Sequence, residues 1–108
     1  TEIYTLSLHD ALPISTDALV LLGRSLADER RHRDALTAFT RVLKFVPDQA
    51  TARFHRGMSL AALGRFAEAL DEWEQVIQGN PTGPLAAAAR AEARSTRDLM
   101  HILQPVEA

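Results

Sequence analysis

An internal repeat with a period of 34 residues constrains this chain more than any other feature. Residues 16–49 align with residues 50–83 without a gap, and ten of the 34 pairs are identical. A period of this length is typical of repeat proteins in which each unit stacks on its neighbours, because one unit cannot bury its apolar face alone. The identical pairs are Ala18/Ala52, Gly23/Gly57, Ser25/Ser59, Leu26/Leu60, Ala27/Ala61, Arg31/Arg65, Ala35/Ala69, Leu36/Leu70, Val42/Val76 and Pro47/Pro81.

Each repeat predicts two helices. In the second repeat, Phe54, Gly57, Leu60 and Ala61 recur at three- and four-residue steps, as an amphipathic helix requires. Gly64 then suits the left-handed geometry that ends a helix. A second amphipathic helix follows over residues 66–77. The sequence Gly-Asn-Pro at residues 79–81 is expected to end this helix. The first repeat predicts helices over 17–28 and 33–45. Its turn, DERRHR, lacks a glycine, so we expect this turn to be less tightly made.

Small and large residues alternate between the two helices of each repeat. A glycine within a helix costs about 1 kcal/mol relative to alanine, which is tolerable if the missing Cβ lets a neighbouring helix approach. We therefore expect a small residue on the second helix to face each glycine, with an aromatic ring filling the space one turn on. These sets are Gly23, Ala35 and Phe39 in the first repeat, and Gly57, Ala69 and Trp73 in the second.

This pattern resembles the tetratricopeptide repeat. The resemblance covers two repeats, 16–49 and 50–83, and implies an all-α solenoid of helix–turn–helix units. The chain departs from the family at Leu19 and Arg53, where an aromatic residue is frequent, and has leucine where a later tyrosine is frequent. The residues that carry the resemblance, and that we expect to pack the repeats, are Gly23, Leu26, Ala35, Phe39 and Pro47, repeated as Gly57, Leu60, Ala69, Trp73 and Pro81.

Residues 84–103 predict a single capping helix after the second repeat. Pro84 suits a first helical turn, and Ala91 and Arg94 replace the glycine and leucine that a third repeat would have. Terminal units of solenoids are atypical because they must cover an exposed core, so we expect a polar outer face. Residues 104–108 are expected to form a tail.

The first fifteen residues do not fit the repeat. Residues 1–14 resemble one reading frame of a common short-read sequencing adapter, with the junction inside the codon of Ser15. We expect this segment to be non-biological and leave it out of the fold. The alternative is a genuine N-terminal segment of unknown role.

The charge balance and composition argue against several classes of partner. After Ser15 the chain has 12 basic and 12 acidic residues, since two of its 14 acids precede it. This neutral balance gives no electrostatic case for nucleic acid or an anionic membrane. No stretch approaches the roughly 20 apolar residues of a membrane span. A cysteine-free chain suits either redox environment, so the compartment stays open, with the cytoplasm favoured.

The sequence predicts neither an enzyme nor a metal or cofactor site. There is no cysteine, and His32, His55 and His101 have no ligand spacing, so we interpret them as scattered surface or turn residues. The serines within the repeats have no nucleophile elbow around them. The basic cluster at Arg30–Arg33 has no interleaved aromatic residue, which favours a solvated turn over a phosphate site.

The resemblance implies a protein or peptide partner bound on the concave surface that the first helices line. Phe54 and Met58 are the candidate apolar anchors, with packing against a neighbouring hairpin as the alternative. A family clamp for a terminal carboxylate is not expected, because Val20 and Phe54 occupy positions where it would need polar residues. The candidate groove residues are Val20, Arg24, Asp28, Thr51, Phe54, Met58 and Ala62.

Two further functional hypotheses remain open. The chain could be the docking or regulatory end of a longer enzyme or assembly protein whose catalytic or membrane domain lies upstream. It could also form a homodimer through exposed repeat ends, with the face near Leu19 and Leu22 as the contact.

Overall fold

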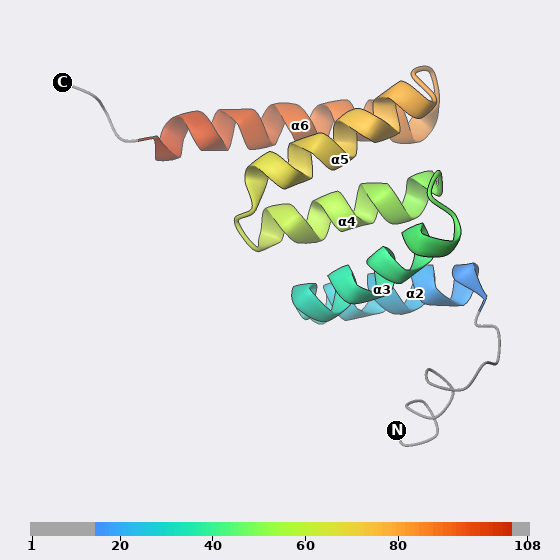
Figure 1. Cartoon of the computed structure of the whole chain (residues 1–108). Coiled ribbons are helices and arrows are strands. Elements are labelled where there is room, and N and C mark those ends of the chain that lie inside the picture. Colours follow the sequence, from blue (N-terminus) through green and yellow to red (C-terminus); the bar gives the residue numbers. More distant parts are fainter. Residues whose placement is uncertain (1–14, 105–108) are drawn as a thin grey trace.

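The computed structural model describes residues 15–104, and Figure 1 shows them as a stack of helices. The helices are α2 (Thr16–Asp28), α3 (His32–Phe45), α4 (Ala50–Ala62), α5 (Phe66–Gly79) and α6 (Pro84–Leu103). No strand occurs within residues 15–104, so the all-α prediction is confirmed. The adapter-like stretch 1–14 and residues 105–108 of the expected tail lie outside the described residues.

The helices form two hairpins and a final helix. α2 pairs with α3 and α4 pairs with α5, and α6 packs on α5 at the end of the stack (Figure 1). The buried apolar residues fall into two clusters. The first combines the α2–α3 hairpin with Ala52 of α4, and the second combines the α4–α5 hairpin with Ala89 and Ala93 of α6. Each hairpin core is therefore completed by the first helix of the unit that follows.

The predicted glycine–aromatic interlock is present in both hairpins. A Cβ atom at Gly23 would lie 2.5 Å from Cε1 of Phe39, and one at Gly57 would lie 2.6 Å from Nε1 of Trp73. Both rings are fully buried, and Nε1 of Trp73 donates a hydrogen bond to the carbonyl oxygen of Phe54 at 3.2 Å. Each glycine thus makes room for an aromatic ring from the facing helix.

The remaining packing residues divide into core and loop positions. Ala35, Ala69 and Leu60 are buried, and Leu26 is half-buried against the first cluster. Pro47 and Pro81 are both exposed, so the expectation that they pack the repeats is wrong. Each proline follows the end of a helix that it cannot continue, and its carbonyl oxygen accepts a hydrogen bond from an arginine of a later helix. Their contribution is to the loops between helices.

The turn between α2 and α3 is closed as tightly as the turn between α4 and α5, contrary to expectation. Arg30 takes a φ of 64°, equivalent to the 81° of Gly64. The N–H of Arg31 donates to the Leu26 carbonyl at 2.8 Å, matching the 2.9 Å bond from Arg65 to Leu60. The hydrogen bonds of this helix-ending motif hold Arg30 in the left-handed region without a glycine.

Arg30→Gly should therefore stabilise the protein. A non-glycine residue in the left-handed region costs about 1–2 kcal/mol, and glycine returns about 0.5–1 kcal/mol as extra entropy of the unfolded chain. We expect a net gain of about 0.5–1 kcal/mol in urea unfolding. Glu29→Gly is the matched control, because Glu29 has a φ of −83° and should lose stability on the same change. Equal effects of the two substitutions would contradict this account.

The final helix, α6, has the length expected of the cap. Gly83 precedes it, Pro84 occupies its first turn, and Ala86, Ala89 and Ala93 face the core. Its outer face is less polar than expected at the C-terminal end. There the helix extends past α5 in Figure 1, and three apolar side chains are exposed: Leu99, Ile102 and Leu103.

Candidate functional site

The structure divides the seven predicted groove residues into exposed and buried sets. Val20 is 7% exposed and Phe54 is 9% exposed, and both belong to the hydrophobic clusters. Phe54 lies in the cluster completed by α6, so it fills the core between hairpins and is unavailable as the predicted surface anchor. The other five offer surface: Arg24, Asp28, Met58 and Ala62 are exposed, and Thr51 is half-buried.

Met58 is the largest exposed apolar side chain among the predicted groove residues on α4. It is 36% exposed and lies one helical turn after Phe54. On the preceding turn, the ring of His55 stacks on Phe39 at a centroid distance of 6.0 Å and meets Phe54 edge-on at 5.2 Å. The buried aromatic rings beneath therefore hold this part of α4 in place.

His55 also links α4 electrostatically to α2. Burial lowers the pKa of His55 below its usual 6.5, the positive charge of Arg24 lowers it further, and the carboxylate of Asp28 raises it. Both α2 residues are predicted groove residues. The junction of α2 and α4 therefore brings Arg24 and Asp28 within electrostatic range of the helix that presents Met58.

This lowered pKa predicts that the fold is less stable in acid. The unfolded chain binds a proton at His55 near pH 6.5, whereas the folded chain binds it only at lower pH. The stability that neutral His55 provides is therefore fully present above pH 6.5. It is lost as the pH falls through the lower pKa that His55 has in the folded chain. We expect His55→Gln to lose less stability than the native chain between about pH 7 and about pH 5 in thermal unfolding. An equal loss in both proteins would show that His55 does not contribute.

An ion-pair network between α4 and α5 was not predicted from the sequence. Arg53 Nη1 lies 2.9 Å from Glu72 Oε1, and Arg56 Nη1 lies 3.0 Å from Glu72 Oε2. Glu72 is only 6% exposed. The repeat alignment could have indicated this network, because the three charged residues align with apolar residues of the first repeat. These are Leu19, Leu22 and Ala38. Charged residues thus replace an apolar set in the second hairpin.

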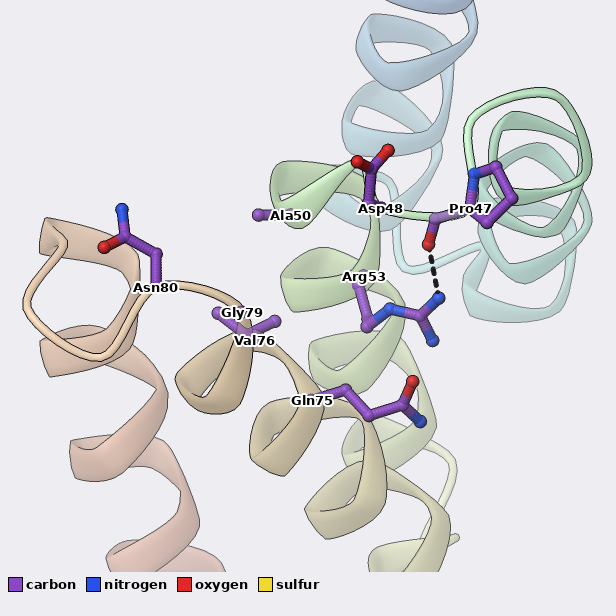
Figure 2. A pocket seen from close by; sticks show the side chains of 8 residues that line it. All are labelled: Pro47, Asp48, Ala50, Arg53, Gln75, Val76, Gly79 and Asn80. Carbon is purple, nitrogen blue, oxygen red and sulfur yellow. Dashed lines mark hydrogen bonds between the residues drawn. The ribbon is translucent and has the colours of Figure 1, made fainter.

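A hollow of about 340 Å³ lies beside this network, where the loop before α4 faces the end of α5 (Figure 2). Figure 2 shows Arg53 reaching toward Pro47, whose carbonyl oxygen accepts a 2.7 Å hydrogen bond from its Nη2. The guanidinium is thus held by Pro47 and Glu72 together. Among the described residues, Asp48 and Arg53 are the charged side chains of this lining.

Neither a metal-binding cluster nor a membrane-crossing helix occurs among the described residues. Within residues 15–104, no three His, Cys, Asp or Glu side chains are grouped so that they could hold a metal ion. None of the helices described is long and apolar enough to cross a membrane.

One of the two apolar residues expected at the α2 end of the stack is buried. Leu19 is buried, whereas Leu22 is 37% exposed and the adjacent Leu21 is 62% exposed. Self-association through this end stays a prediction, with Leu21 and Leu22 as the side chains that could contribute.

The geometry and the sequence comparison agree on the family. A family model described as tetratricopeptide repeat matches residues 20–96. The chain belongs to the tetratricopeptide repeat family. The match covers most of α2, all of α3, α4 and α5, and most of α6. A comparison with curated proteins finds no match. Tetratricopeptide repeats are in general modules of protein–protein interaction and are typically non-catalytic.

Proposed function

We propose that this tetratricopeptide repeat chain is a non-enzymatic module that binds a protein segment on the surface formed by α2, α4 and α6. The observation that carries the proposal is the exposure of Met58 directly beside buried, tightly packed neighbours. A flexible thioether on a fixed helix can adapt to varied apolar side chains without distorting the fold. Met58 is accordingly the proposed apolar anchor.

The polar residues around this anchor favour binding of an internal segment of the partner over binding of its C-terminal carboxylate. Arg24 and Asp28 offer one charge of each sign on α2, and Thr51 offers a hydroxyl on α4. A terminal carboxylate would need several converging donors, and Val20 and Phe54 occupy two of the places where the family puts them. The small side chain of Ala62 leaves room for a partner side chain one turn beyond Met58.

Selection from a displayed peptide library against the full chain tests this assignment. For the selected peptides, Met58→Ala should weaken binding by roughly tenfold, since burying such a side chain is worth about 1.5 kcal/mol or more. Thermal unfolding should change little, because Met58 is partly exposed already. Phe54→Ala is unsuitable as a test because it would open a cavity in the core.

Leu99→Ala is the matched control. Leu99 has a similar exposure of 41%, but lies near the C-terminal end of α6. Its replacement should leave peptide affinity unchanged. If Met58→Ala has no effect, or if Leu99→Ala weakens binding equally, the assignment of the binding surface is wrong.

A further inference from the structure

A second open groove lies between α3 and α4, away from the predicted concave surface. Its volume is about 750 Å³, and among residues 15–104 its lining contains five cationic side chains and no acidic one. The cations are Arg33, Arg41, Lys44, Arg56 and Arg65. In a chain whose formal net charge is −2, this is a local concentration of positive charge.

Some of these cations already have carboxylate partners. Arg56 pairs with Glu72, and Arg65 pairs with Glu68 through two hydrogen bonds of 2.8 Å. Arg33 and Lys44 are exposed and form no salt bridge among residues 15–104. Asp34 is the single acidic residue of α3, and Arg31 binds it at 2.8 Å. Within the described part of the chain, the α3 wall of the groove therefore carries at each end a cation without a salt-bridge partner.

The spacing of these charges fits an extended chain. Arg33 and Lys44 are eleven residues apart on α3, which corresponds to about 16 Å along the helix axis. An extended peptide covers that length in about five residues. One small anion could not contact both ends, whereas a short segment with several carboxylates could.

The apolar part of the lining argues for a peptide over nucleic acid. Leu36, Leu60 and Leu63 contribute to the groove, together with the hydroxyl-bearing Thr37 and Thr40. Among the described residues, the lining has no aromatic side chain on which a base could stack. Leucines between cations suit an aliphatic residue flanked by acidic ones.

The equivalent groove between α5 and α6 is lined by residues of both charges. It is lined by Arg90, Arg94 and Arg97, but also by Glu74 and Asp98. A shift of 34 residues relates Arg56 to Arg90 and Thr40 to Glu74. The α5–α6 groove therefore contains acidic groups that the described lining of the α3–α4 groove lacks, and it provides an internal control.

We propose that the α3–α4 groove is a second docking site, which binds an acidic, leucine-containing peptide segment in an extended conformation. Charge complementarity would speed association and select against partners that lack acidic residues. The site is separate from the proposed concave surface, so one partner could use either surface or both.

Fluorescence anisotropy with the labelled peptide EELDELE tests the site, with QQLNQLQ as its neutral counterpart. We expect EELDELE to bind and QQLNQLQ to bind at least roughly tenfold more weakly, because several charge pairs each contribute about 0.2–1 kcal/mol. Binding should weaken as the NaCl concentration rises. Arg33→Glu combined with Lys44→Glu should reduce the affinity by at least roughly tenfold, with an unchanged circular dichroism spectrum.

Arg94→Glu combined with Arg97→Glu is the matched control, since it makes the same charge change in the α5–α6 groove. An equal loss in this control would overturn the proposal, because attraction would then depend on overall charge. A labelled oligouridylate that binds more tightly than EELDELE and is lost in the α3 variant would also overturn it in favour of nucleic acid. Met58→Ala should leave EELDELE binding unchanged, so failure of the concave surface and failure of this groove are distinguishable.

Discussion

Gly57→Ala should destabilise the protein by about 2 kcal/mol, although alanine is the better helix former. The added Cβ would lie 2.6 Å from Nε1 of Trp73 and 3.0 Å from two further indole atoms. Trp73 is fully buried, and its N–H is bound to the Phe54 carbonyl. The ring cannot withdraw without breaking that bond and disturbing the core around it, and this cost exceeds the propensity gain of about 1 kcal/mol.

Gly79→Ala is the control for the helix-propensity effect. Gly79 is the last residue of α5, and a Cβ there would meet nothing within 4 Å. We expect it to be neutral or to stabilise by up to about 1 kcal/mol in the same urea titration. If Gly57→Ala instead matches or exceeds the native stability, the close approach of Trp73 does not require glycine.

Glu72→Gln should cost about 3 kcal/mol, since it leaves two partly buried guanidinium groups without their shared carboxylate. The side chains of Arg53 and Arg56 are 17% and 31% exposed, and that of Glu72 is 7% exposed. Water can solvate the arginines in part, which keeps the loss at the lower end of the range for a broken buried ion pair. Urea unfolding of the native and variant chains measures it.

The first repeat suggests how to remove the network without this cost. Replacing the charged set by the residues at the equivalent positions gives Arg53→Leu, Arg56→Leu and Glu72→Ala in one chain. Apolar replacement of a whole buried ion network is often neutral or stabilising, so we expect this triple variant to be at least as stable as the native chain. A loss as large as that of Glu72→Gln would show that the ion pairs themselves contribute net stability.

The helices and their pairing could be predicted from the sequence because two independent patterns agree on them. Apolar periodicity placed the helices of the first repeat at 17–28 and 33–45, within one residue of the observed Thr16–Asp28 and His32–Phe45. The gap-free repeat then required the second hairpin to have the same pairing. Arg30 shows the limit of local rules, since the hydrogen bonds of the turn impose a conformation that its side chain disfavours.

The candidate surface could be predicted only in part. Helical phase indicates which residues share a face, but it does not indicate how far the next unit covers that face. Phe54 shares a face with Met58, yet it lies in the cluster that α6 completes. The ion network was missed because Arg53 and Arg56 follow no charge pattern along their own helix, and Glu72 is distant in sequence. Their contact arises only when α4 packs on α5.

Nuclear magnetic resonance mapping of backbone amides during titration with a selected peptide shows whether the partner binds the surface formed by α2, α4 and α6. We expect the largest chemical-shift changes on the surface of α2 and α4, extending to the neighbouring face of α6. The residues expected to shift most are Arg24, Asp28, Thr51, Met58 and Ala62. Changes confined to α3 and α5, or to the two ends of the stack, would contradict the claim that this surface binds the partner.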